Sequence, residues 1–114
     1  MKTIKELPDT KGKYVLIFVS NHCPYCKQVE KILKEMEKEY APKGIEFYVL
    51  NISSNPEIAT KYNIMSTPLT YFMNGKTVVG KELGAVSKRT VELELEELLK
   101  AGEFIKKIKK IFGF

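Results

Sequence analysis

The two cysteines of this chain form one Cys-x-x-Cys motif, and its position restricts the possible fold more than any other feature. Cys23-Pro24-Tyr25-Cys26 follows the apolar run 14–19, whose sequence YVLIFV is typical of a fully buried strand. Apolar side chains then recur at helical spacing, at Val29, Ile32, Leu33, Met36 and Tyr40. The sequence therefore predicts a strand, a turn that carries both cysteines, and an amphipathic helix.

We expect the cysteines to lie at the start of this helix, with Cys23 as the N-cap and Pro24 as the first helical residue. Proline is tolerated there because its missing N–H would have no partner within the helix. A thiolate is the nucleophile in disulfide exchange, and a helix N-terminus offers free N–H donors and a positive dipole end. These donors, with His22 adding to them, should lower the pKa of the Cys23 thiol.

The spacing also suggests a role for each cysteine. Three residues apart in the first turn, the two sulfur atoms are close enough to pair, with Cys23 at the exposed end and Cys26 turned inward. We infer that Cys23 attacks a disulfide and that Cys26 resolves the intermediate. His22 and Pro24 are candidate modulators, His22 being either an exposed neighbour or a proton shuttle. Tyr25 either forms one wall of a substrate groove or only packs against neighbouring side chains.

Other uses of the two cysteines fit the sequence less well. A structural disulfide that closes so short a loop would constrain the unfolded chain little. A zinc or iron–sulfur site needs about four ligands, whereas His22 and the two thiols supply three unless two copies share a site. We therefore expect no metal and no cofactor. A non-catalytic interaction module, whose dithiol senses redox state or binds metal, remains the alternative from another functional class.

Length and composition favour a small cytoplasmic domain. A chain of 114 residues suits one domain, and we see neither a cleavable leader nor an apolar stretch long enough to cross a membrane. A dithiol in the reducing cytoplasm is more often catalytic than structural. The net charge is +5, but Arg89 is the only arginine, so we expect no nucleic-acid partner.

The remaining pattern predicts an α/β domain over residues 1–102, with a central mixed four-stranded sheet flanked by helices. A small element around residues 3–7 could precede it. Asn74-Gly75 is a strong hairpin signal, and Ser87 can cap a last helix that ends near Lys100. The other predicted elements are a strand at 45–51, a helix from Asn55-Pro56 to about 62, and strands at 69–73 and 76–83.

Residues 103–114 form a basic amphipathic tail with four lysines and one glutamate. At helical spacing its apolar residues share one face, and the lysines occupy the other. Packing of this face on the chain's own domain is the favoured interpretation. Peripheral contact with a membrane surface is the alternative.

These motifs resemble those of the thioredoxin/glutaredoxin superfamily over residues 14–100. The Cys23–Cys26 motif is similar to that of glutaredoxins. The second half resembles that of thioredoxins, at residues 61–64, Thr67-Pro68, Asn74-Gly75 and Gly84-Ala85. Taken together, the chain is similar to small glutaredoxin-like thioredoxins of archaea. The resemblance implies a thioredoxin-like fold and a monomeric enzyme that reduces protein disulfides through a reversible Cys23–Cys26 disulfide.

The resemblance also implies partners and a substrate groove. In the superfamily the proline that matches Pro68 is cis and packs against the disulfide, and the backbone before it, here Thr67, pairs with a substrate strand. The partners implied are disulfide-containing target proteins and an electron donor of the thioredoxin reductase type.

Three departures separate this sequence from the family patterns. Ile17 and Val49 stand where thioredoxins have a buried aspartate and a lysine, and His22 replaces a tryptophan. Residues 83–87 follow the thioredoxin pattern and not the Gly-Gly turn with which glutaredoxins bind glutathione. This difference argues against glutathione as a substrate, and a glutathione-linked glutaredoxin is therefore kept only as the alternative function. Without a buried carboxylate the Cys23 thiolate should form more easily, and we expect a reduction potential above the about −270 mV of thioredoxin.

Overall fold

The computed structural model describes residues 1–112, and it describes side chains as far as Ala101. The elements follow one another as β1 (Lys2–Thr3), β2 (Lys13–Val19), α1 (Cys26–Tyr40), the 3-10 turn η1 (Ala41–Lys43), β3 (Ile45–Asn51), α2 (Pro56–Lys61), β4 (Leu69–Asn74), β5 (Thr77–Leu83) and α3 (Lys88–Phe112). This order confirms the predicted α/β class. The predicted strands and helices all form, with small shifts at their ends except for the last helix, which is longer than predicted.

The strands form one mixed sheet in the order β1-β3-β2-β4-β5. Four strands were predicted, and the fifth is β1, whose two residues pair in parallel with β3. Two residues carry too little pattern to be recognised as a strand in the sequence. Central β2 runs parallel to β3 and antiparallel to β4, and β4 and β5 form the hairpin predicted at Asn74-Gly75.

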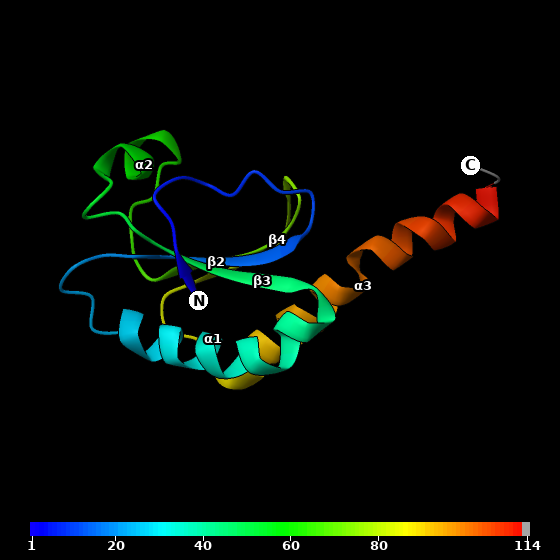
Figure 1. The fold of residues 1–114 in the computed structure, drawn as a ribbon, viewed down its shortest axis with the longest axis horizontal. Coiled ribbons are helices and arrows are strands. Elements are labelled where there is room, and N and C mark those ends of the chain that lie inside the picture. The colour runs from blue at the N-terminus through cyan, green and yellow to red at the C-terminus, as the bar shows by residue number, and fades with distance from the viewer. Residues whose placement is uncertain (113–114) are drawn as a thin grey trace.

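The helices cover the two faces of the sheet unequally. Figure 1 shows α1 and α3 together on one face and the short α2 on the other. The core on the first face joins the strands to buried residues of both long helices, among them Val29, Leu33, Val91 and Leu95. The core on the second face includes Ile58 of α2 and Ile64 just after it.

The helix α1 forms as its apolar spacing predicts. Its buried side chains are Cys26, Val29, Leu33, Met36 and Tyr40. The helical stretch then ends through η1 at Gly44, whose φ of 94° is a left-handed value that glycine adopts without strain. The chain thereby enters β3 directly and returns parallel to β2.

The last helix differs from the prediction at its C-terminal end. The Ser87 hydroxyl accepts a hydrogen bond from the Thr90 N–H at 3.1 Å, which confirms the predicted cap. However, α3 continues to Phe112 and does not end near Lys100. Residues 103–112 include no proline, and half of them are glutamate or lysine, which are good helix formers, so nothing after Lys100 forces an end. The side chains of the tail, and with them its predicted packing, lie outside the described residues.

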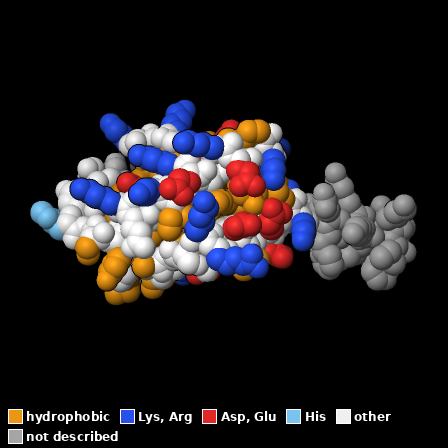
Figure 2. All heavy atoms as spheres, turned by 90° about the horizontal axis from the view of Figure 1, so that it is seen from below, with side chains coloured by type: hydrophobic (Ala, Val, Ile, Leu, Met, Phe, Trp, Pro, Cys, Tyr) orange, Lys and Arg blue, Asp and Glu red, His pale blue; other side chains and the backbone are white. Residues whose placement is uncertain are grey.

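The surface over α1 and α3 is strongly charged. In Figure 2 lysine and acidic side chains are interspersed on this face. Among the described residues, no helix is both long enough and apolar enough to cross a membrane.

Candidate active site

Cys23 and Cys26 form a disulfide at the N-terminal end of α1. Their Cα atoms are 5.4 Å apart, a usual separation for a disulfide. Cys26 is the first residue of α1 and only 4% exposed, whereas Cys23 is half-buried. The two sulfur atoms thus pair as the spacing predicts, and the inner cysteine is Cys26.

The start of the helix differs from the prediction. Tyr25 is the N-cap, so Cys23 lies two residues before the cap and Pro24 is not helical. The Cys26 N–H donates to the Cys23 carbonyl at 3.4 Å and closes a tight turn, and the Val29 N–H donates to Tyr25 at 3.1 Å. This turn, rather than the first helical turn, carries Cys23. The disulfide nevertheless keeps its sulfur beside the helix N-terminus.

A hydrogen-bond network fixes the loop before Cys23 to the end of β3. The Asn21 N–H donates to the Ser53 hydroxyl at 3.0 Å, and the Asn51 side-chain amide donates to the Asn21 side-chain oxygen at 3.2 Å. The Asn51 oxygen in turn accepts from the Ser53 N–H at 2.8 Å. His22, between Asn21 and Cys23, is exposed and has a positive φ of 62°. The sequence did not predict this network, although polar residues that follow two parallel strands are its signal.

The Thr67–Pro68 peptide bond is cis, as the resemblance implies. Pro68 is buried, and its carbonyl accepts a hydrogen bond from the Gly84 N–H at 2.8 Å. The hydroxyl oxygens of Thr67 and Ser20 lie 2.6 Å apart and share a hydrogen bond. Ser20 therefore ties the segment before the cysteines to the segment before Pro68, a link that the sequence did not predict.

A hollow of about 800 Å³ opens beside the dithiol. It brings His22, Pro24 and the two cysteines together. Tyr25, Thr67 and Pro68, the three predicted groove residues, do not line this hollow, and the Tyr25 side chain is 55% exposed. The other residues that line it are Val19, Ser20, Asn21, Lys27, Glu30 and Asn51.

The core next to Cys26 is apolar. Ile17 and Val49 face each other in the register of β2 and β3, so the two departures from the thioredoxin pattern are neighbours. Ile17 is fully buried, and both residues belong to or pack against the cluster that contains Cys26. Over the part of the chain with described side chains, no group of three or more histidine, cysteine or acidic residues could hold a metal ion.

Comparisons with known proteins agree with this geometry. The thioredoxin domain family matches residues 13–100. The chain is 37% identical over 95 residues to a thioredoxin of Buchnera aphidicola, with 83% of each chain covered. It is 41% identical over 111 residues to a chloroplastic M-type thioredoxin of Spinacia oleracea, which covers 87% of this chain and 59% of that protein.

A solved structure shows the same fold. It comes from work on the thiol resolving mechanism of a yeast mitochondrial 1-Cys peroxiredoxin. The TM-score is 0.72 at 17% sequence identity, over 85% of this chain and 94% of that chain.

Proposed function

The chain belongs to the thioredoxin domain family, and from this premise we propose how its dithiol works: Cys23 attacks target disulfides and Cys26 resolves the intermediate. The protein is a thiol–disulfide oxidoreductase that reduces protein disulfides. The observation that supports these roles is the difference in burial between the two cysteines. Cys23 is half-buried and lines the hollow, whereas Cys26 is 4% exposed and begins α1.

The reaction needs no oxidant or reductant beyond the reduced Cys23–Cys26 dithiol and the disulfide of the target protein. The Cys23 thiolate attacks one sulfur of the target, a mixed disulfide forms, and the other target sulfur leaves as a thiolate. Cys26, after losing its proton to that thiolate, to His22 or to water, attacks the Cys23 sulfur. The target leaves with two electrons and two protons gained, and Cys23 and Cys26 are left as a disulfide.

The substrate groove of this proposal runs along Thr67. The backbone of Thr67 would pair with an extended segment of the target, as in the superfamily that the sequence resembles. The hydrogen bond between Ser20 and Thr67 supports this role because it holds Thr67 next to the loop that carries Cys23. The exposed ring of Tyr25 would contact the target on the other side of the sulfur.

We further infer that the protein acts as a cytoplasmic monomer and receives electrons from a reductase of the thioredoxin reductase type. The thioredoxins among its relatives support this donor. Residues 83–87, which follow the thioredoxin pattern and not the glutathione-binding one, support it from the sequence. Residues 1–102 form the catalytic domain in this proposal.

Reduction of insulin disulfides, followed by the turbidity of the released B chain, tests the proposal. Three reductants are compared: NADPH with a thioredoxin reductase, glutathione with glutathione reductase, and dithiothreitol. We expect turnover with the reductase and none with Cys23→Ser. Turnover with glutathione alone would instead support the glutathione-linked alternative, and no turnover with any reductant would contradict the proposed function.

A further inference from the structure

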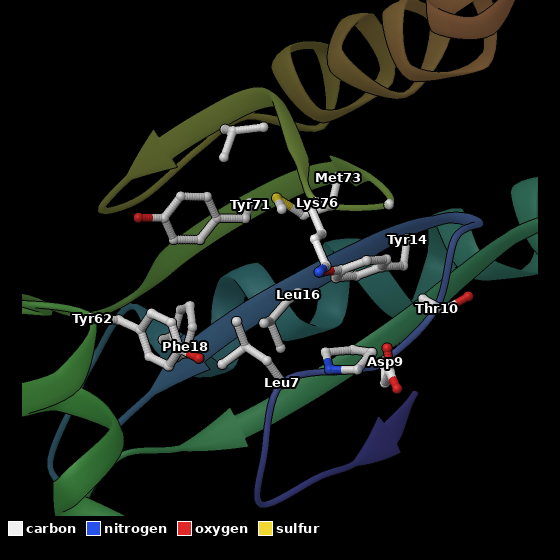
Figure 3. Close-up of a pocket in the computed structure, with 13 residues that line it drawn as sticks. Leu7, Asp9, Thr10, Tyr14, Leu16, Phe18, Tyr62, Tyr71, Met73 and Lys76 are labelled. Carbon is white, nitrogen blue, oxygen red and sulfur yellow. The ribbon is translucent and has the colours of Figure 1, made fainter.

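A second cavity lies on the opposite face of the sheet from α1, where α2 leaves the strands uncovered (Figure 3). Its volume is about 460 Å³, within the range of small-molecule sites. Among the described residues, none lines both this cavity and the hollow beside the dithiol. The cavity is therefore separate from the redox site.

Four aromatic rings form part of its wall. Tyr14 and Phe18 of β2, Tyr71 of β4, and Tyr62 just after α2 all line the cavity, with Leu16 and Met73 between them. Phe18 and Tyr71 meet edge to face with ring centroids 5.8 Å apart. Tyr14 meets Tyr48 of β3 in the same way at 5.9 Å. Because these contacts fix the rings, the cavity is already formed without a ligand.

One lysine lines the cavity, and two others lie against rings of its wall. Lys76, in the turn between β4 and β5, belongs to the lining, and Figure 3 shows its side chain extending toward the cavity. The Lys81 ammonium lies 5.7 Å from the Tyr71 ring centroid, and the Lys61 ammonium lies 5.5 Å from that of Tyr62. Lys76 therefore places a positive charge in the lining of the cavity, whereas Lys61 and Lys81 lie against two of its rings without lining it.

Two carboxylates on the same side of the sheet offset part of this charge. Asp9 lines the cavity, and Glu46 accepts a hydrogen bond from the Tyr48 hydroxyl. Of the residues that line the cavity, Lys76 and Asp9 carry opposite charges, and they belong to different segments of the chain, Lys76 to the β4–β5 turn and Asp9 to the segment before β2. Burial, with a smaller effect of Tyr62, raises the pKa of Tyr14 above its ordinary value of 10.0. The Tyr14 hydroxyl therefore keeps its proton at neutral pH and can donate a hydrogen bond.

We propose that this cavity binds a small organic anion with a flat aromatic body. The aromatic part lies among the tyrosine and phenylalanine rings, where edge and face contacts between rings are favourable. The anionic group lies at the Lys76 end, where the ammonium group attracts it. The site makes the chain a binding protein as well as a disulfide reductase, and it does not depend on the cysteine roles proposed above.

Two fluorescent probes that differ chiefly in charge test this assignment on the full-length oxidised protein. The anionic probe is 1-anilinonaphthalene-8-sulfonate, and its neutral counterpart is N-phenyl-1-naphthylamine. We expect one anionic probe to bind per chain, more tightly than the neutral probe. Near-ultraviolet circular dichroism, recorded in the same samples, reports whether the protein stays folded.

Substitutions locate the probe. Lys76→Ala should raise the dissociation constant of the anionic probe roughly fivefold, the effect of losing one partly screened charge pair, and leave that of the neutral probe unchanged. Lys34→Ala removes the same charge from the exposed side of α1 and should change neither. Tyr62→Ala, which removes an aromatic wall at a 40% exposed position, should weaken both probes.

Several results would overturn the proposal. Equal affinity for the two probes would show that the cavity does not require an anion. An unchanged dissociation constant of the anionic probe in Lys76→Ala would show that the probe binds elsewhere. Binding of several probes per chain would exclude a single aromatic site. The same conclusion would follow if Tyr62→Ala changed the dissociation constant of neither probe. Fluorescence that rises only when the near-ultraviolet signal is lost would report unfolded chain and would count against the cavity.

Discussion

At the scale of single residues, Ile17 and Val49 decide the electrostatics around the dithiol. They pair in register across β2 and β3, and Ile17 is fully buried in the cluster that contains Cys26. An apolar side chain at position 17 cannot repel a second negative charge nearby, as a buried carboxylate would. The ionisation of the reduced Cys23 is therefore governed by the turn and the helix N-terminus.

We predict that the pKa of reduced Cys23 lies below the about 8.5 of a free cysteine. The N–H groups at the start of α1 favour the thiolate, and no carboxylate at position 17 opposes it. Ultraviolet absorbance of the thiolate, followed against pH in Cys26→Ser, measures this ionisation. A pKa at or above that of free cysteine would contradict the prediction.

Ile17→Asp tests the cause. A carboxylate at this position should raise the Cys23 pKa by like-charge repulsion. Asparagine has nearly the size of aspartate but no charge, so Ile17→Asn should leave the Cys23 pKa near its value in the unchanged protein. Both variants place a polar group in the core and should lose stability, by about 2–5 kcal/mol. The comparison between them therefore isolates the charge, and an equal pKa in both would exclude the proposed repulsion.

The positions and contacts of single residues were also the features that the sequence predicted least well. The burial of Cys26 followed from helical spacing, but the helix begins at Cys26 because a tight turn closes first, so the prediction of Cys23 as N-cap was wrong. The Ser20–Thr67 hydrogen bond joins residues far apart in the chain. Such contacts depend on how the strands are brought together, which no local pattern reports.

At the scale of elements, α3 meets the β5 strand through a carboxylate. The Glu94 carboxylate occupies the space above Gly80 where any other residue would place a Cβ atom. Burial raises the pKa of Glu94 above its ordinary value of 4.5, and Glu82 and Glu97 raise it further. The folded protein thus binds this proton more tightly than the unfolded chain does.

We predict that Glu94→Gln stabilises the protein at pH 7. Ionisation of Glu94 costs stability as the pH rises from the ordinary pKa through the raised one, and the amide removes that cost. The gain should be less than about 1 kcal/mol at pH 7, because the group is partly solvated, and smaller at pH 4. Urea unfolding at the two pH values measures it.

Glu92→Gln is the matched control, since Glu92 is an exposed glutamate on the same helix. It should shift the urea midpoint less at pH 7 than Glu94→Gln does. If both substitutions have the same effect, the gain comes from net charge and not from the contact between α3 and β5.

Elements were predicted better than single residues because their patterns are local. The strand at 45–51 matches β3 at both ends, and Asn74-Gly75 gives the hairpin. The predicted end of the last helix near Lys100 was wrong, since α3 continues to Phe112.

At the scale of the whole molecule, the predicted division between a domain and a tail is open to a direct test. The described contacts of α3 with the core come from its first part, through Val91, Leu95 and Leu98. We predict that a chain ending at Gly102 folds, unfolds cooperatively, and keeps its insulin reductase activity. Its free energy of unfolding should change by less than about 1 kcal/mol.

Urea unfolding and the insulin assay, run on the full and shortened chains, check this prediction. Loss of cooperative unfolding would mean that the tail is part of the core. Sedimentation of the full chain with anionic vesicles, absent for the shortened chain, would support the membrane alternative for residues 103–114.

The whole fold could be predicted because the strand and helix patterns agree with one family, whereas the cavity on the face of the sheet that α2 leaves uncovered could not. Tyr14, Phe18 and Tyr71 looked like ordinary strand residues in the sequence. Only the sheet order and the short length of α2 show that their rings border an open space.

Trapping of a mixed disulfide tests the central claim, that Cys23 attacks and Cys26 resolves, most directly. Reduced Cys26→Ser and Cys23→Ser are each mixed with insulin, and the products are separated without reducing agent and weighed by mass spectrometry. The roles proposed here predict a covalent adduct through Cys23 in Cys26→Ser and little or none in Cys23→Ser. An adduct formed mainly by Cys23→Ser would reverse the two roles and contradict the mechanism.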